Sequence, residues 1–203
     1  MCLQRISKKI FYFIFLFLFV VFLIPNQVKG SQNILSSQIS KYFFKINNFT
    51  SKFIQSDSDG IQEGDIYLSN KVKRIKIHYN KPSNIVFVLK NNKAMYFNVD
   101  LEEVEYFDPR KTIAKIIFEI FNDNMIENFD KYVVNENICK FYIDLNHDDI
   151  EYFIEIVFEL KPLQLRLVNI SSEEENLSFG LRDHNFNNVF DKNFFSMANP
   201  LLK

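Results

Sequence analysis

The chain has 203 residues, with 24 lysines and arginines against 25 aspartates and glutamates, which gives a formal net charge of −1 at pH 7. This balance argues against a nucleic-acid partner, because such a partner requires a stripe of basic side chains. Phenylalanine occurs 24 times and cysteine only twice, so the fold is expected to depend on apolar burial rather than on disulfides.

The first 30 residues have the pattern of an export signal. Basic side chains precede an uninterrupted apolar run at residues 10–24, which is shorter than the ~20 residues that a membrane-spanning helix needs. A small-residue cleavage site, Val28-Lys29-Gly30, follows. We therefore expect export to the periplasm with cleavage near Gly30. An uncleaved membrane anchor is the alternative.

Removal of residues 1–30 changes the charge of the chain. The segment holds four basic residues and no acidic ones, so 20 basic residues then oppose 25 acidic ones and the net charge becomes −5. Cys2 leaves with the segment, whereas Cys139 lies in an apolar run and is expected to be a buried, unreactive thiol. Residues 31–203 have the length of one domain.

Two segments show apolar residues at the three- and four-residue spacing of an amphipathic helix, residues 31–48 and 109–121. The rest of the chain alternates between apolar and polar residues and is punctuated by turn residues, which predicts short antiparallel strands. These strands are expected at residues 49–55, 61–68, 73–80, 85–89, 94–99, 103–107, 131–135, 140–145, 150–160, 163–170 and 177–181. The fold class is therefore mostly β (α+β), an antiparallel sheet whose apolar face the two helices cover.

If the helices cover that face loosely, a cavity remains beneath them. The candidates to line it are apolar or aromatic side chains of the predicted strands: Ile75, Ile77, Tyr79, Val86, Val88, Met95, Phe97 and Tyr106. Ordinary core packing is the alternative for each, because alternation alone does not tell which face of a strand points inward.

Catalytic motifs are absent from the sequence. It contains no Gly-x-Ser-x-Gly, no phosphate-binding loop and no His-Glu-x-x-His, and its three histidines are scattered. His147 is followed by two aspartates, but these lie in a predicted hairpin turn, where Asp and Asn are the usual turn formers. We expect a protein that is not an enzyme, with no catalytic residues, no metal and no cofactor. A secreted lipid hydrolase is the weak enzymatic alternative.

Several short patterns follow one another in a recognisable order after residue 30. They are the aromatic and glutamine strand at 49–55, Gly64, Tyr79 with Pro82, the apolar run 85–89 before Asn91-Asn92, the pair Asp100-Leu101, and three closing segments at 161–165, 177–179 and 191–195. Together they resemble the LolA family of periplasmic lipoprotein carriers, and the last three segments look like the closing strands of that family. The resemblance covers most of the chain after the export signal.

The resemblance implies an open antiparallel β half-barrel with a helical lid over an apolar cavity. In the family this cavity holds the acyl chains of a lipoprotein, which the carrier accepts from an inner-membrane ABC transporter and passes to an outer-membrane receptor of the Lol system. We expect the same partners here, and a monomer. A related half-barrel that senses lipid, or a tethered lipid-binding protein, is the alternative.

The resemblance also implies a role for two basic residues. An arginine of the family holds the lid closed through hydrogen bonds to carbonyls at helix ends, and Lys71 stands at the matching position, with Arg74 close behind. Lysine lacks the rigid, five-donor fork of arginine. A solvated pair of surface charges is the alternative.

Overall fold

The computed structural model describes residues 35, 37–43, 46, 48–69, 73–122, 129, 131–147 and 149–202. The predicted export signal and Lys71 lie outside these residues. Ser36–Lys203 form one compact unit. Within the described residues, no helix combines the length and the apolar character that crossing a membrane would require.

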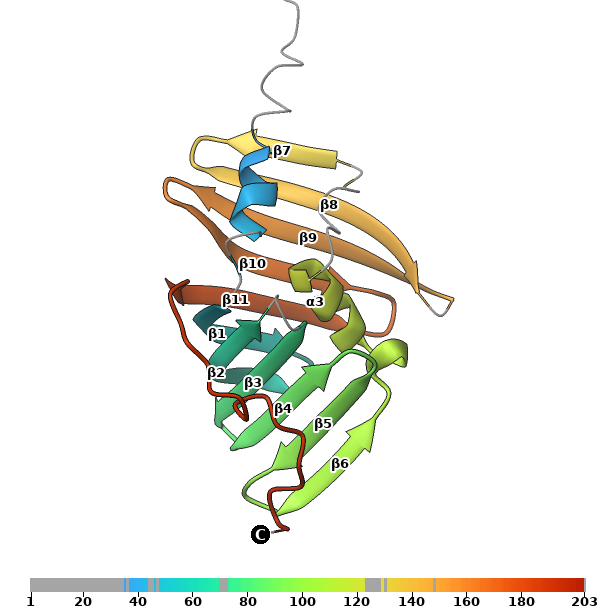
Figure 1. Ribbon diagram of the computed structural model, residues 1–203. Helices are drawn as coiled ribbons and strands as arrows, with labels where there is room; N and C mark the ends of the chain where they lie inside the picture. Colours follow the sequence, from blue (N-terminus) through green and yellow to red (C-terminus); the bar gives the residue numbers. More distant parts are fainter. Residues whose placement is uncertain are drawn as a thin grey trace, which may run out of the picture. The chain divides into compact units, whose positions relative to one another are not determined.

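The described part of the chain builds one sheet of eleven antiparallel strands in the order β6-β5-β4-β3-β2-β1-β11-β10-β9-β8-β7 (Figure 1). The strands are β1 (Asn48–Asp57), β2 (Gly60–Ser69), β3 (Arg74–Lys81), β4 (Ile85–Lys90), β5 (Lys93–Asn98), β6 (Glu103–Phe107), β7 (Lys131–Asn135), β8 (Ile138–His147), β9 (Ile150–Leu160), β10 (Leu163–Ser171) and β11 (Asn176–Asn185). The two edge strands, β6 and β7, do not pair, so the sheet stays open. The predicted fold class is confirmed, and β8 and β11 are longer than predicted.

Local sequence explains most of these pairings. In β3, Ile75 and Ile77 are buried whereas the intervening Lys76 is half-buried, as the period of two in a strand requires. The β1–β2 hairpin closes through Ser58 and Asp59, and Gly60 follows with a φ of 122°, which L side chains rarely adopt. Alternation and turn chemistry therefore select the same register.

Gly64 marks a close approach between chain segments. It sits where the β2–β3 register shifts, and a Cβ at this position would collide with the backbone carbonyl oxygen of His78 and approach the ring of Phe53 to 2.8 Å. Only glycine allows the phenyl ring and the neighbouring strand to lie this close.

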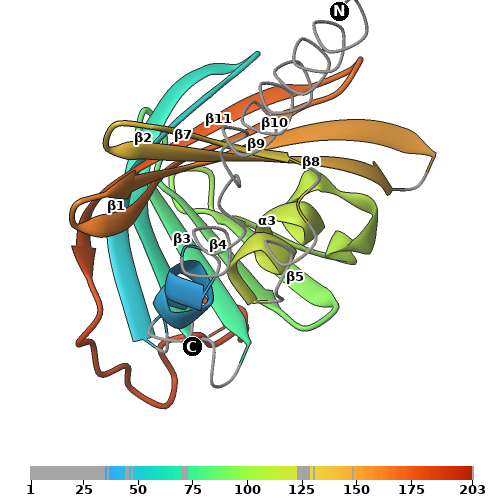
Figure 2. The ribbon, with the colours of Figure 1, turned by 90° about the horizontal axis from the view of Figure 1, so that it is seen from above.

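Two helical segments lie in the hollow of the curved sheet, one at residues 37–43 and the other α3 (Ile113–Asn122) (Figure 2). The predicted helix at 109–121 divides into a 3₁₀ turn, η2 (Pro109–Lys111), and α3. The division occurs because Thr112 is extended, with φ −137° and ψ 158°. The side chain of Asp108 caps η2 by accepting a hydrogen bond from the backbone N–H of Arg110.

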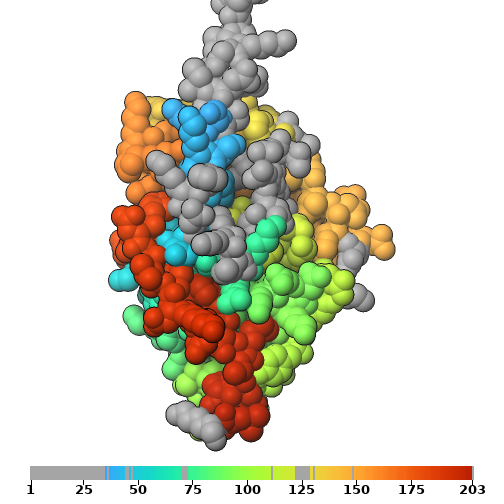
Figure 3. Space-filling view, viewed as in Figure 1, coloured from blue at the N-terminus to red at the C-terminus, as the bar shows by residue number. Residues whose placement is uncertain are grey.

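The predicted closing strand at residues 191–195 is wrong, because residues 192–195 form turns. Their aromatic side chains do not alternate but gather in one cluster, in which Phe190 stacks on Phe194 at 4.8 Å and both contact Phe195. This cluster packs on Val88 and Met95 of the sheet. The C-terminal segment consequently runs across the surface of the first six strands (Figure 3).

Candidate functional site

A cavity of about 270 Å³ lies between the concave face of β3 and β4 and the helix α3. Its apolar lining comes from three strands and the helix: Ile75, Ile77, Tyr79, Phe87, Leu89, Leu177, Ile113, Ala114 and Ile117. Pairing explains the strand side of this wall, since Ile77 lies opposite Phe87 and directly paired residues face the same side of a sheet. Helical spacing explains the other side, since Ile113 and Ile117 are four residues apart.

Tyr79 stands in the cavity wall, and its hydroxyl is satisfied by Gln55, which lines the same cavity. The hydroxyl donates to Oε1 of Gln55 at 2.9 Å, and Nε2 of Gln55 donates to a carboxylate oxygen of Asp57 at 2.6 Å. The ring of Phe53 packs edge-on against the tyrosine at 5.1 Å. Burial raises the pKa of Tyr79, so it stays neutral. The cavity therefore gains apolar surface from Tyr79 without an unpaired polar group.

The rim of the cavity is polar and acidic. Carboxylates of Asp57, Asp59 and Glu175 stand there, at the β1–β2 and β10–β11 turns, together with Ser58 and Asn176. An apolar interior with a solvated rim suits a molecule whose apolar part enters while its polar part stays in water. Carboxylates at the mouth disfavour an anionic head at that position.

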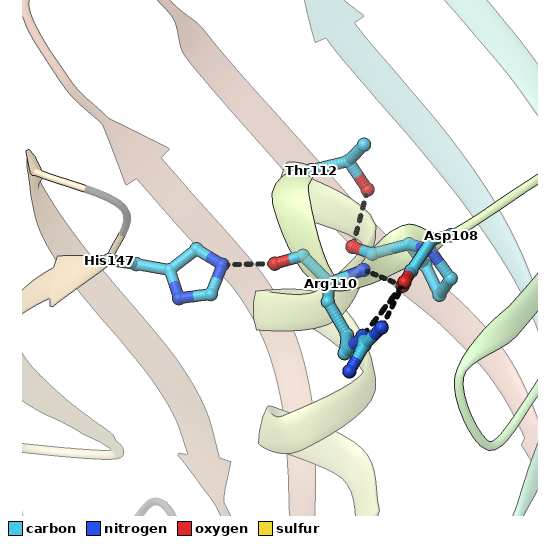
Figure 4. Close-up of polar contacts among 5 residues, drawn as sticks. Asp108, Arg110, Thr112 and His147 are labelled. Atoms are coloured by element: carbon cyan, nitrogen blue, oxygen red, sulfur yellow. Dashed lines mark hydrogen bonds and ion pairs between the residues drawn. The ribbon is translucent and has the colours of Figure 1, made fainter.

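The turn before α3 is held to the opposite half of the sheet. His147, at the end of β8, donates from Nε2 to the backbone carbonyl oxygen of Arg110 at 2.6 Å (Figure 4). A carbonyl only accepts hydrogen bonds, so Nε2 must carry the proton. The guanidinium of Arg110 pairs with both carboxylate oxygens of Asp108, and the hydroxyl of Thr112 donates to the carbonyl oxygen of Pro109. These contacts fix the point at which the chain enters α3.

The helix at residues 37–43 is attached through Tyr42. A β-bulge in β10 leaves the backbone N–H of Leu165 available to a side chain. The hydroxyl of Tyr42 accepts a hydrogen bond from this N–H at 3.1 Å. The same hydroxyl lies 3.4 Å from Nδ1 of His184. Burial raises the pKa of Tyr42 to about 12, and burial, assisted by the charge of Arg166, lowers the pKa of His184 to about 4. The contact is therefore between two neutral groups at neutral pH.

A second irregularity explains why His184 reaches this position. The β1–β11 register shifts between Thr50 and Lys52, and Asp183 has a φ of 56°. A bulge of this kind turns the following side chain. The imidazole of His184 then packs edge-on against Phe49 at 5.2 Å.

The structure divides the eight predicted lining residues between two faces. Ile75, Ile77 and Tyr79 stand in the cavity wall. Val86, Val88, Met95 and Phe97 instead belong to the aromatic cluster under the C-terminal segment. Tyr106 is 53% exposed, and its hydroxyl donates to the carbonyl oxygen of Met197 at 3.0 Å. Whether the three wall residues contact a lipid remains a prediction.

Phe87, Leu89 and the α3 residues Ile113, Ala114 and Ile117 were not predicted as lining residues. The signal for Phe87 was its place opposite Ile77 in the β3–β4 pair, which the chain shows only once the register is known. Arg74 lies on the face opposite the cavity, because alternation places it with Lys76 rather than with Ile75. Among the described residues, no three histidine, cysteine, aspartate or glutamate side chains are grouped so that they could hold a metal ion.

Comparison with known protein families finds a match over most of the chain. The family model described as "Outer membrane lipoprotein carrier protein LolA" matches residues 45–198. No curated protein matches the sequence.

Similar solved structures include an uncharacterized conserved protein from Thermus thermophilus, at 7% identity and a TM-score of 0.49, with 76% of this chain and 90% of that chain covered. A LolA superfamily protein from Nitrosomonas europaea is also 7% identical, with a TM-score of 0.44 and coverages of 73% and 90%. The MucA/MucB complex of Pseudomonas aeruginosa is 11% identical, with a TM-score of 0.44 and coverages of 78% and 59%.

Proposed function

The chain belongs to the LolA family of outer membrane lipoprotein carrier proteins, and from this premise we propose that it carries the acyl chains of lipoproteins in the cavity under α3. The carrier would work in the periplasm, accept its cargo from an inner-membrane ABC transporter and pass it to an outer-membrane receptor of the Lol type. It would bind its cargo without chemical turnover. The observation that carries the proposal is the apolar cavity between Ile77, Phe87 and Ile117.

The physical need for such a carrier is clear. Each methylene group of an acyl chain costs about 0.8 kcal/mol to expose to water, so a lipoprotein does not cross an aqueous compartment without shielding. The lining of aliphatic and aromatic side chains supplies that shield. It offers no pattern of polar groups that would select one acyl chain over another, which suits a carrier of many cargoes.

The size of the cavity implies that α3 moves. Its volume of about 270 Å³ is just below the ~300–1,000 Å³ that drug-sized ligands occupy. An acyl group with several chains is larger than such a ligand, so loading requires α3 to move away from β3 and β4. Such a movement would change the contacts at the start of α3, among them the hydrogen bond of His147, and the packing of its buried residues, such as Ile116 and Ile120.

A cavity-filling variant tests this proposal. Ala114 faces the cavity from α3, and Ala114→Leu adds three carbon atoms to the empty space. We expect the variant to fold normally and to bind a fluorescent fatty-acid probe roughly thirtyfold more weakly, because room for about three methylene groups, worth ~2 kcal/mol, is lost. The matched control is Ala198→Leu, which makes the same change at an exposed position of the C-terminal segment.

Two further readouts separate a carrier from other lipid-binding proteins. A triacylated lipoprotein should displace the probe from the wild-type protein, and an acyl-ester probe should be recovered intact after incubation. Equal probe binding by Ala114→Leu and Ala198→Leu would contradict the role of the cavity. Release of free fatty acid from the ester probe would contradict the proposal that no turnover occurs.

A further inference from the structure

Three basic residues form a row across the face of the sheet opposite the cavity. Arg74 of β3 pairs with Lys90 of β4, and Lys90 pairs in turn with Lys93 of β5. Directly opposite residues point to the same side of a sheet, so the three cations are neighbours. Like charges placed opposite one another destabilise a sheet. This arrangement lowers the stability of the free protein and favours the binding of an anion.

The row is not neutralised within the protein. Among the described residues, no ion pair joins Arg74, Lys90, Lys93 or the nearby Lys192 to a carboxylate. The Nε of Arg74 is buried and has no hydrogen-bond partner there. Asp191 supplies one acidic side chain to the same region. The basic charges therefore outnumber the acidic ones at this site.

These residues line a hollow of about 1170 Å³ between the sheet and the C-terminal segment. Apolar side chains of that segment, Phe190, Phe195 and Met197, form part of its wall. Val189, the residue before this cluster, is 94% exposed. The hollow is thus bordered on the sheet side by the row of cations. On the side of the C-terminal segment it is bordered by aromatic and aliphatic groups together with Asp191 and Lys192.

We propose that this basic hollow, defined by Arg74, Lys90, Lys93 and Lys192, is a docking site for the phosphate head groups of an anionic lipid membrane. The row of cations matches a row of phosphates, and the hollow is far larger than a free phosphate ion requires. The exposed Val189 beside the hollow suits the boundary between head groups and acyl chains. Because the rest of the protein carries excess negative charge, the site would orient the molecule on the membrane.

The cavity lies on the other face of the same strands. Arg110, in the turn before α3, also reaches the wall of the hollow, but none of the variants below changes that turn, so the hollow has its own test. Full-length protein is titrated with vesicles of phosphatidylcholine, or of an equimolar mixture of phosphatidylcholine and phosphatidylglycerol, at low and at high salt. The variants are Lys90→Gln with Lys93→Gln and, separately, Lys192→Gln. The matched control, Lys131→Gln with Lys161→Gln, removes the same charge at exposed positions elsewhere. All proteins share residues 1–30, so any contribution of that segment cancels between them.

We expect the wild-type protein and the control to prefer the phosphatidylglycerol vesicles and to lose that preference at high salt. The Lys90/Lys93 variant should bind those vesicles roughly thirtyfold more weakly, from about 1 kcal/mol for each basic residue near an anionic surface. Lys192→Gln should weaken binding severalfold, and the Lys90/Lys93 variant should melt no lower than the wild type because it loses a repulsion. Equal weakening in the control, or wild-type protein without preference for the anionic vesicles, would overturn the proposal, and an acidic protein surface would then become the better occupant.

Discussion

Acid is expected to weaken the attachment of the helix at residues 37–43 through His184. Burial lowers the pKa of this imidazole from 6.5 to about 4, with a further contribution from the positive charge of Arg166, and Asp183 opposes the shift only in part. The unfolded chain takes up a proton near pH 6.5, whereas the folded protein resists it until about pH 4. Stability from this group is therefore fully present above pH 6.5 and is lost as the pH falls toward 4.

The size of the effect follows from the shift. A difference of about 2.5 pKa units corresponds to at most ~3 kcal/mol, at 1.36 kcal/mol for each unit. The imidazole is only partly buried, and solvent screening reduces that figure. We expect His184 to account for about 1–2 kcal/mol of acid destabilisation.

Urea unfolding of the wild type and of His184→Phe, at neutral pH and at about pH 4.5, measures this contribution. Phenylalanine keeps the aromatic packing against Phe49 and does not titrate. Carboxylates titrate equally in both proteins, so the difference between the two losses of stability isolates the imidazole. Equal losses in the two proteins would refute the reasoning.

Other predictions concern single contacts. Tyr42→Phe leaves the N–H of Leu165 buried without an acceptor, so it should lower the free energy of unfolding by about 1–3 kcal/mol in a urea titration. An unchanged free energy of unfolding would mean that water replaces the hydroxyl. Gly64→Ala should destabilise the protein by about 1–3 kcal/mol in the same assay, whereas Gly180→Ala, whose Cβ meets no atom nearer than 3.7 Å, should cost less than half as much. The Cys139 thiol is buried and its pKa is raised to about 11, so iodoacetamide should label it only in denaturant; labelling of the folded protein at neutral pH would contradict its burial.

The sequence by itself determined the strands and helices because their patterns are local. The alternation in β3 and the helical spacing of Ile113 and Ile117 are visible without any partner. The division at Thr112 and the turns at residues 192–195 were not visible, because both depend on what the neighbouring chain contacts. Aromatic residues were expected in a strand there and instead form a cluster that covers the sheet.

The inward face of the sheet was decided only by the tertiary structure. The first five residues of β4, Ile85 to Leu89, are all apolar, so alternation offers no contrast between its two faces. In the folded chain Phe87 and Leu89 line the cavity under α3, while Val86 and Val88 lie under the C-terminal segment. Helix α3, about 25 residues away in the sequence, covers one face of this strand, and the C-terminal segment, about 100 residues away, covers the other. A period of two tells which side chains share a face, but only long-range packing tells what each face meets.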